Sequence, residues 1–465
     1  EVDFDEKVTL PVSNRIRGEQ MEIINRWMNT DPSIRLKYSD YYFGLSNVQE
    51  LNCGKEKNIR RFDVVGKKAA EEKELQAWID ADPARKAEWG SIIPLLNEKY
   101  AAVEDAERDI TYYRETLVRG TTISRMMSRL NMLKREVLNK NHIRMHTFID
   151  KGGPDSTEIE CCRRFRFCGR DYNAIRTSLL NDYDKIVPEV ERDLFKYSVR
   201  EYYANIDSSV LGPYQKELLA QYTGDDGKCD FDAMTDWLWE NSFMTDRAKL
   251  EAFVTQEHTL DEYFADPMFR FFQDVRIITL NRRVSAIEGT PTILALDREY
   301  THARYRKSLA DGLAQYPDAN STMRITYGTV GDIDPYDGVK WSWHSTSAGI
   351  LEKYDPSSYE FSLDSRQKAL LEKGDWGRWA AKDGRMYVNF LTDNDITGGN
   401  SGTPVMNARG ELIGLAFDGN KESLASDVYY VDGYTKCVCV DIRYVLWVLE
   451  NYAGMGYILD EIGLD

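Results

Sequence analysis

The 465-residue chain is 42% hydrophobic and 29% charged, which is typical of a globular protein of two or three domains. Its 77 acidic residues outnumber its 60 basic ones, and the net charge of -17 repels phosphate backbones and anionic membrane surfaces, so we expect no nucleic acid partner. No apolar run approaches the roughly 20 residues of a spanning helix, so we expect no membrane span.

The first residues, EVDFDEK, contain neither an initiator methionine nor a signal-peptide pattern, which indicates a processed or truncated product. The chain has seven cysteines: Cys53, Cys161, Cys162, Cys168, Cys229, Cys437 and Cys439. Because this number is odd in a large chain, it defines no disulfide framework, and the pairing of the cysteines stays open.

Helical patterns dominate the first two thirds of the chain. From about residue 20 to residue 141, apolar residues recur at helical spacing with charged residues between them. Similar patterns resume over residues 172–203 and 247–255, between turns rich in glycine and proline. We therefore predict that residues 1–318 form a large, mainly α-helical domain.

Short apolar or alternating runs replace the helical pattern after residue 318. The predicted strands cover residues 323–330, 386–391, 412–417, 428–431 and 437–442. Because no helical stretches separate the strands, a mostly antiparallel barrel or sandwich is favoured over a doubly wound sheet. The predicted class is α+β, with a second domain over residues 319–465.

Glycines crowd around one serine between two predicted strands, in the run Gly398-Gly399-Asn400-Ser401-Gly402. Glycines permit backbone conformations that aim neighbouring N–H groups at one point, as acyl transfer requires for its oxyanion. A bare Gly-x-Ser-Gly more often forms a solvated β-turn. Here Thr-Pro-Val, a glycine-containing turn and an apolar strand follow, and the whole segment resembles the nucleophile region of chymotrypsin-like peptidases.

Longer segments make this resemblance more specific. They are NDITGGNSG at 394–402, GELIGLAFDGN at 410–420 and VDIRYVL at 440–446. Together with residues 34–47 and 324–361, they are similar to the S46 family, which comprises bacterial serine dipeptidyl aminopeptidases of the dipeptidyl-peptidase 7 and 11 type. The similarity implies the C-terminal β-barrel of a chymotrypsin-like double barrel, preceded by a helical lid domain.

The resemblance implies a role for several residues. Ser401 would be the nucleophile, and the N–H groups of Gly399 and Ser401 would form the oxyanion hole. Asp418 would accept a hydrogen bond from the α-ammonium group of the substrate, with Asn47 of the lid holding the same group. This accounts for exopeptidase action, because an internal peptide bond offers no cation to offset burial of the carboxylate. The expected partners are peptides with a free N-terminus.

The residue after the Phe417-Asp418 pair bears on specificity. In the family an arginine at this position accompanies an acidic P1 residue, the substrate residue whose carbonyl is attacked. Gly419 occupies the position here. The resemblance therefore implies a pocket without charge and a hydrophobic P1 preference.

The resemblance also implies that catalytic partners are missing. In chymotrypsin-like folds the triad order is His, Asp, Ser, and family members carry the first two in an N-terminal barrel segment that we expect to be absent here. The five histidines are His142, His146, His258, His302 and His344. None stands in the family's histidine motif, and a packed or surface role is favoured for His344. Because losing a triad member lowers kcat by about 10⁴- to 10⁶-fold, we expect this chain alone to be nearly inactive.

Metal sites are disfavoured, and we expect no metal and no cofactor. His142 and His146 lie four residues apart but lack the glutamate of a zinc peptidase motif. The cysteines at 161, 162 and 168 lack a second matched pair. Residues 332–343 resemble a calcium loop, but Trp343 replaces the glutamate needed at the twelfth position.

A second class of function stays open. A noncatalytic protein that retained the peptidase fold could bind peptide N-termini without cleaving them, although the intact Gly399 to Gly402 segment and Asp418 disfavour this alternative. For either function the family likeness implies secretion to a bacterial periplasm or cell surface, and a homodimer.

Overall fold

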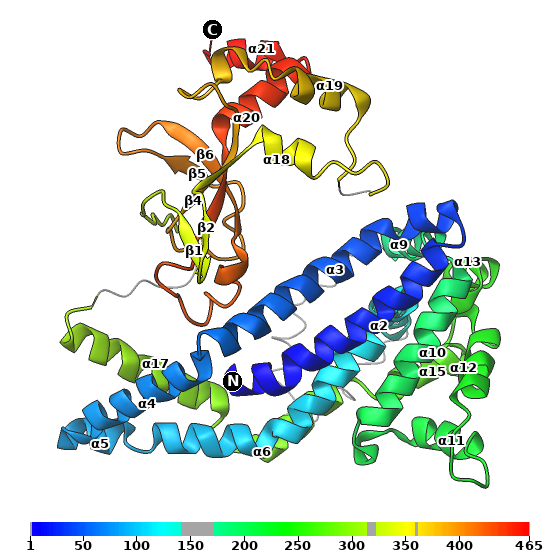
Figure 1. Cartoon of the computed structure of the whole chain (residues 1–465). Helices are drawn as coiled ribbons and strands as arrows, with labels where there is room; N and C mark the ends of the chain where they lie inside the picture. The colour runs from blue at the N-terminus through cyan, green and yellow to red at the C-terminus, as the bar shows by residue number, and fades with distance from the viewer. Residues whose placement is uncertain (1, 141–171, 314–321, 359–360, 465) are drawn as a thin grey trace. The chain divides into compact units, whose positions relative to one another are not determined.

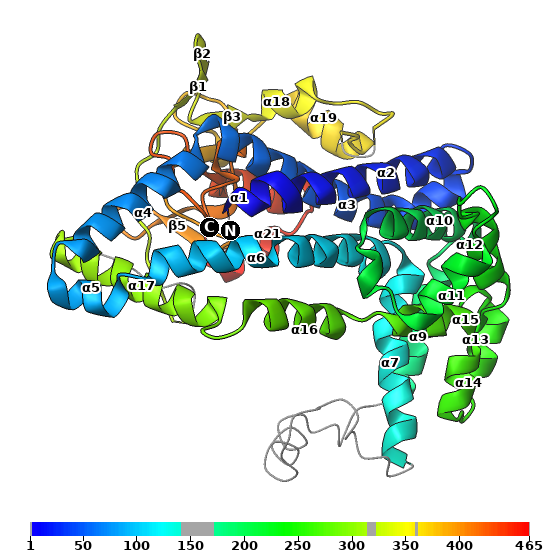
Figure 2. The same ribbon diagram turned by 90° about the horizontal axis from the view of Figure 1, so that it is seen from below.

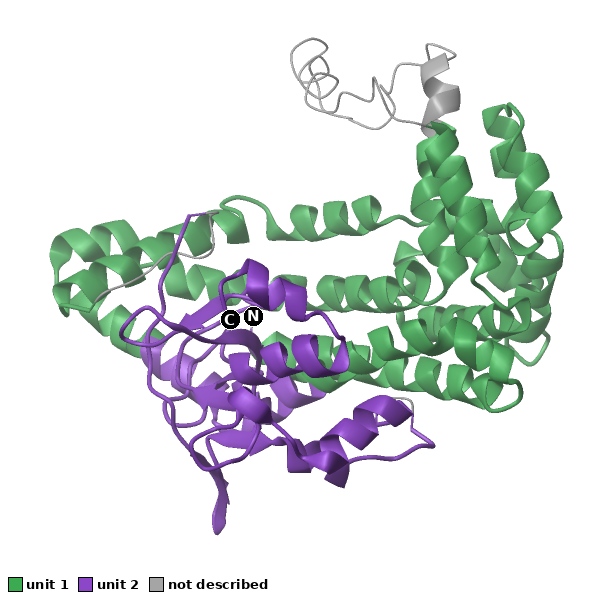
Figure 3. Cartoon of the chain, turned by 90° about the horizontal axis from the view of Figure 1, so that it is seen from above, with its two compact units in different colours: residues 1, 3–52, 72–313 green, residues 2, 53–71, 314–465 purple. Residues whose placement is uncertain are grey.

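The computed structural model describes residues 2–140, 172–313, 322–358 and 361–464. The chain divides into two compact units (Figure 3). The first comprises Glu1, Asp3–Asn52 and Glu72–Leu313, and the second comprises Val2, Cys53–Glu71 and Ala314–Asp465. The second unit therefore includes a stretch of the helical region in addition to the residues after 318.

Helices build the first unit, as predicted. The helices up to residue 140 are α1 (Val2–Phe4), α2 (Leu10–Met28), α3 (Pro32–Arg61), α4 (Val64–Asp80), α5 (Pro83–Trp89), α6 (Ile92–Tyr113) and α7 (Thr122–Lys140). Those from residue 172 onward are α9 (Tyr172–Asp184), α10 (Pro188–Asn205), α11 (Pro213–Gln221), α12 (Phe231–Glu240), α13 (Arg247–Val254), α14 (Leu260–Ala265), α15 (Pro267–Asp274), α16 (Ile277–Glu288) and α17 (Ile293–Ala310). Helices α3 and α4 continue from one unit into the other.

Local sequence explains where several helices begin. The Asp246 carboxylate accepts from the backbone N–H of Lys249 at the start of α13, and Asp266 accepts from Phe269 at the start of α15. Such caps satisfy N–H groups that have no partner inside the helix. At α14, Thr259 and Glu262 form a reciprocal capping box.

Aromatic and aliphatic side chains fill the core of the helical unit. Helix α6 packs against α16 and α17, and α10 packs against α2 and α12 (Figures 1 and 2). Phe195, Tyr202, Phe269 and Phe271 are each at most 1% exposed at the centre of this core. Full burial of one large apolar side chain contributes about 1.5–3 kcal/mol, so packing and not helix propensity stabilises these helices.

The second unit contains a hairpin and an antiparallel sheet. The hairpin consists of β1 (Ile333–Tyr336) and β2 (Val339–Trp341). The sheet has the order β3-β4-β7-β6-β5, with all neighbours antiparallel. Its strands are β3 (His344–Thr346), β4 (Tyr387–Thr392), β5 (Pro404–Met406), β6 (Leu412–Gly419) and β7 (Cys437–Asp441). The helices of this unit after residue 346 are α18 (Ser347–Glu352), α19 (Ser365–Lys373), α20 (Ile442–Trp447) and α21 (Gly456–Glu461).

The described sheet is open, with β3 and β5 at its edges. The α+β class and the antiparallel pairing agree with the prediction from the sequence, whereas the described residues do not form a closed barrel. The apolar centre of the sheet contains Phe390, Ala416, Cys437 and Cys439, all at most 5% exposed.

Two predicted strands are wrong. Residues 323–329 have the alternating pattern of a strand but join no ladder in the described chain, and only Val330 pairs, in an isolated bridge with Thr392. Residues 428–431 belong to no strand. The N–H of Tyr429 donates to the carbonyl of Ala425, and the Val431 carbonyl accepts from the N–H groups of Tyr434 and Thr435. The predictions for 386–391, 412–417 and 437–442 are confirmed by β4, β6 and β7.

Candidate active site

The loop between β4 and β5 presents Ser401 to solvent. Gly399 has a φ of 101° and Gly402 a φ of 82°, backbone conformations that side chains with a Cβ rarely adopt. The N–H of Gly402 donates to the carbonyl of Ala416 over 2.7 Å, and the Asn400 side chain accepts from the N–H of Thr397 over 2.8 Å. The two glycines therefore set the shape of the loop. The bond between Thr397 and Asn400 lies within the loop, and the bond from Gly402 to Ala416 fastens the loop to β6.

Ser401 lies against a strand irregularity. Its Oγ donates to the main-chain carbonyl of Phe417 over 3.3 Å. In β6, Ala416 pairs with Cys439 and Asp418 pairs with Val438, so Phe417 is an extra residue opposite β7. Such a bulge re-aims the side chains next to it, and bulges are frequent beside active sites.

The bulge is followed by the predicted recognition residues. Asp418 is exposed, and its Oδ1 accepts from the N–H of Gly419 over 2.8 Å. The Phe417 side chain is 61% exposed. A Cβ added at Gly419 would stand 2.2 Å from the Oγ of Ser423, so no side chain fits at 419 unless Ser423 moves. No motif in the sequence pointed to Ser423.

His344 lies away from the serine loop within the sheet unit. Strand β3 is separated from β6 by β4 and β7, and three strand spacings amount to about 14 Å. The imidazole ring packs on Trp343 and Tyr387, with both ring centroids 4.2 Å away. Burial lowers the pKa of His344, and Arg385 adds to the effect. This agrees with the packed role and not with that of a base for Ser401.

The predicted site residues are distributed between the two units. Ser401, Phe417, Asp418 and Gly419 come together in the second unit, whereas Asn47 lies on α3 in the first unit. The role of Asn47 in substrate binding stays a prediction. The described histidines of the first unit are His258, which stacks on Phe253, and His302, which meets Trp89 edge-on.

Some of the residues weighed and disfavoured as metal ligands lie within the described structure. His142, His146, Cys161, Cys162 and Cys168 lie outside the described residues. Within the described ranges, no group of three or more His, Cys, Asp or Glu residues is placed to hold a metal ion. The calcium-like segment forms the β1–β2 hairpin, where Lys340 pairs with Asp332 over 3.0 Å. Cys437 and Cys439 are free thiols with their sulfur atoms 3.6 Å apart.

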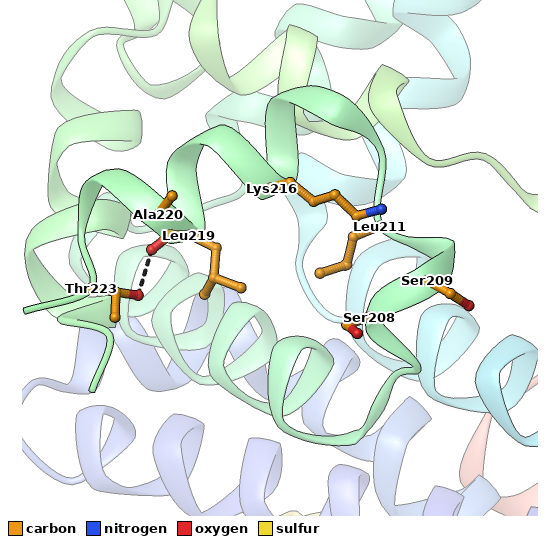
Figure 4. A pocket seen from close by; sticks show the side chains of 7 residues that line it. All are labelled: Ser208, Ser209, Leu211, Lys216, Leu219, Ala220 and Thr223. Atoms are coloured by element: carbon orange, nitrogen blue, oxygen red, sulfur yellow. Dashed lines mark hydrogen bonds between the residues drawn. The ribbon is translucent and has the colours of Figure 1, made fainter. Parts of the chain in front are cut away.

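A groove also occurs in the first unit, between α11 and the 3₁₀ turn at Ser208–Val210 (Figure 4). Leu211 and Leu219 line it, and Lys216 extends beside it (Figure 4). It shares no residue with the Ser401 loop, so the serine loop and not this groove defines the candidate active site. Among the helices that the structure describes, none combines the length and apolar character needed to cross a bilayer.

Comparison with known proteins identifies the family of the chain. The Peptidase S46 family model matches residues 1–464, and the chain belongs to this family. Dipeptidyl-peptidase 7 of Porphyromonas endodontalis is 31% identical over 455 residues, which cover 97% of this chain and 50% of the relative. The Asp/Glu-specific dipeptidyl-peptidase of the same organism is 30% identical over 454 residues, covering 96% of this chain and 58% of the relative.

Solved structures show the same fold. The crystal structure of Porphyromonas endodontalis DPP11 in complex with dipeptide Arg-Glu matches with a TM-score of 0.78 at 28% identity, covering 99% of this chain and 61% of that chain. The chain therefore spans about half to three fifths of the length of these relatives.

Proposed function

We propose that the chain provides the nucleophile and the amino-group site of a serine dipeptidyl aminopeptidase. One observation carries the proposal: the exposed hydroxyl of Ser401 lies 3.3 Å from the carbonyl of Phe417, directly before Asp418 on the same strand. A nucleophile, a backbone acceptor and a carboxylate thus occur together at the bulge in β6. Family membership and the names of the curated relatives support the same activity.

The geometry suggests a separate role for each of these residues in substrate binding and acyl transfer. The α-ammonium group of the peptide binds Asp418 by a charge-assisted hydrogen bond. Because the N-terminus is held there, two residues precede the bond that is cleaved. The hydroxyl of Ser401 attacks the second carbonyl, and the N–H groups of Gly399 and Ser401 stabilise the oxyanion. The acyl-enzyme retains the dipeptide until water releases it.

Serine attack requires a base, and we propose that a histidine outside the described residues supplies it. His344 packs three strands away, and the other described histidines belong to the first unit. In the proposed architecture, a second barrel carrying His and Asp completes a chymotrypsin-like pair with residues 319–465, and residues 1–318 form the lid that carries Asn47.

We further propose a hydrophobic P1 preference. One crystal structure of Porphyromonas endodontalis DPP11 is a complex with the dipeptide Arg-Glu, which has an acidic second residue. In this chain Gly419 adds no charge beside Asp418, and Ser423 occupies the space that a longer side chain would need. Family likeness also supports a bacterial periplasmic or cell-surface location, a homodimer and a reaction without metal or cofactor.

Release of a fluorophore from dipeptidyl amides tests the proposal. The full-length gene product should cleave substrates that have a free amino group and a hydrophobic P1 residue. Its Asp427→Asn variant, changed at a carboxylate outside the site, should match it. Acetylation of the substrate amino group should abolish turnover, because Asp418 then meets no cation. Equal cleavage of blocked and unblocked substrates would contradict the proposal.

The rival function is a noncatalytic protein that binds peptide N-termini. If the full-length protein does not cleave any amide but binds free dipeptides in a calorimeter, and acetylated dipeptides do not bind, the rival is correct. The exposed Ser401 hydroxyl would then be a remnant of the peptidase fold.

A further inference from the structure

The loop that follows Asp418 is anchored at its first residue. Asn420 donates its N–H to the carbonyl of Lys436 over 3.0 Å, and its side-chain oxygen accepts from the N–H of Lys436 over 2.9 Å. Its side-chain nitrogen donates to the carbonyl of Tyr434 over 2.9 Å and to the carboxylate of Glu422 over 3.0 Å. Every side-chain polar atom of Asn420 is therefore used to fix the chain two residues beyond Asp418.

Glu422 is a charged residue in a buried position. It is only 2% exposed, and one carboxylate oxygen accepts the bond from Asn420. The other oxygen lies 3.9 Å from Arg61 and 3.9 Å from Lys421 and has no hydrogen-bond donor among the described residues. A carboxylate is costly to bury and is retained where it fixes a conformation or serves a function.

Arg61, the last residue of α3, brings the compensating charge. Its guanidinium group lies over the rings of Tyr336, Phe62 and Tyr434, 4.4, 5.0 and 5.3 Å from their centroids, and donates to the carbonyl of Pro335. Stacking on three rings holds this group in one orientation. The cation opposite Glu422 is thus preorganised by residues of the same unit.

A second contact joins α3 to this loop. The side chain of Asn58, 5% exposed, donates to the carbonyl of Lys421 over 2.7 Å. A Cβ added at Gly54, one turn earlier, would stand 2.1 Å from the Leu424 side chain, so the helix and the loop approach closely. These contacts lie within the second unit, which includes Cys53–Glu71.

We infer that Glu422, which faces Arg61 of α3, is a positioning residue. Together with the bond from Asn58 to the Lys421 carbonyl, it fixes the loop after Asp418 and so aims the Asp418 carboxylate at the substrate ammonium group. The inference rests on the proposed function. Asp418 itself is exposed and accepts a hydrogen bond only from the N–H of Gly419 among the described residues. Its placement must therefore come from the backbone on either side, and on one side that backbone is the loop anchored by Glu422.

The test uses the full-length protein and its Glu422→Gln, Arg61→Lys and Asn58→Ala variants. Lys55→Ala is the matched control, because Lys55 also joins α3 to this loop, through the exposed Asp427. Asn58→Ala leaves the buried charges paired, so it serves if Glu422→Gln does not fold. Thermal unfolding establishes which variants are folded before kinetics are measured.

We expect KM for an unblocked dipeptidyl amide to rise by about tenfold in Glu422→Gln, with a smaller change in kcat. The pH dependence of KM is measured as well, because a variant that only lost stability would keep it unchanged. In the unsubstituted protein, KM should rise as the substrate amine loses its proton near pH 8, since the ammonium group binds Asp418. In Glu422→Gln this rise should be smaller, and in Lys55→Ala it should be unchanged.

Two results would overturn the inference in different ways. If folded Glu422→Gln and Asn58→Ala both keep the KM and the pH dependence of the unsubstituted protein, the positioning role is wrong and the proposed function stands. If KM of the unsubstituted protein does not depend on the protonation of the substrate amine, the proposed role of Asp418 is wrong. The proposed function is then wrong as well, whatever the variants show.

Discussion

Ser401 and Phe417 are joined by a hydrogen bond of 3.3 Å from the serine hydroxyl to the main-chain carbonyl. Phe417 is the bulged residue of β6, and Asp418 follows it. The bond therefore ties the serine loop to the point at which the strand departs from regular pairing.

Alanine at Gly399 should reduce activity more than it reduces stability. The φ of 101° at this position is strained for any residue with a Cβ, at a cost of about 1–2 kcal/mol. The strain would rotate the N–H group that we place in the oxyanion hole. Gly410→Ala is the control, because Gly410 also has a positive φ, 78°, in the turn between β5 and β6.

Urea unfolding and dipeptidyl amide turnover of the full-length protein separate the two effects. Both variants should lose similar stability, and only Gly399→Ala should lose turnover. Equal turnover in the two variants would show that the N–H group of Gly399 does not contribute to the oxyanion hole.

Asparagine at Asp418 should weaken binding of the substrate amino group. A hydrogen bond to a charged group contributes about 1.5–3 kcal/mol, so kcat/KM for unblocked substrates should fall by about 10- to 100-fold. Glu411→Gln, which changes an exposed carboxylate paired with Arg409, is the control. If Asp418→Asn and Glu411→Gln give the same steady-state kinetics, Asp418 does not bind the ammonium group.

The specificity at position 419 should depend on Ser423. Gly419→Arg alone should lower both stability and turnover, because the new side chain meets the Ser423 hydroxyl. Adding Ser423→Gly should restore stability and favour substrates with glutamate at P1 over those with leucine. Turnover of the two substrates by both variants checks this, and an unchanged preference in a stable double variant would contradict it.

His344 should affect the pH dependence of stability but not catalysis. Burial lowers the folded-state pKa of His344 below the value of about 6.5 in the unfolded chain. As the pH falls through 6.5, the unfolded state binds a proton that the folded state does not, so the free energy of unfolding decreases. Denaturant unfolding between pH 7.5 and pH 5 should show a smaller decrease in His344→Gln.

Catalysis by the full-length His344→Gln variant should equal that of the unsubstituted protein. His302→Gln, in the helical unit, is the control for the general effect of removing a histidine. A large loss of kcat in His344→Gln alone would show that His344 serves Ser401 after all.

The sequence correctly predicted the helices and strands that are determined by the pattern of their own residues. Amphipathic spacing over residues 20–141 gave the helices, and apolar runs gave β4, β6 and β7. The prediction was wrong for residues 323–329, because a strand forms only beside a pairing partner. An alternating pattern does not show which strand, if any, lies beside a segment. The sequence also could not show that Cys53–Glu71 belongs with the second unit, since the helices α3 and α4 are continuous across the division.

The sequence also predicted which residues of the candidate site lie together. Glycine density around Ser401 and the Phe417-Asp418-Gly419 run indicated a nucleophile and its neighbours, because short motifs preserve local geometry. Ser423, Glu422 and Arg61 carried no such signal. Their roles arise from a turn and from a helix more than 350 positions earlier in the chain, and a pattern of neighbouring residues contains no record of such contacts.

Covalent labelling of the full-length protein with a fluorophosphonate, followed by mass spectrometry of its peptides, tests whether Ser401 is the nucleophile. We expect one label, on Ser401, with loss of amide hydrolysis in proportion to labelling and no label in Ser401→Ala. A label on another residue, or full hydrolysis by Ser401→Ala, would contradict it.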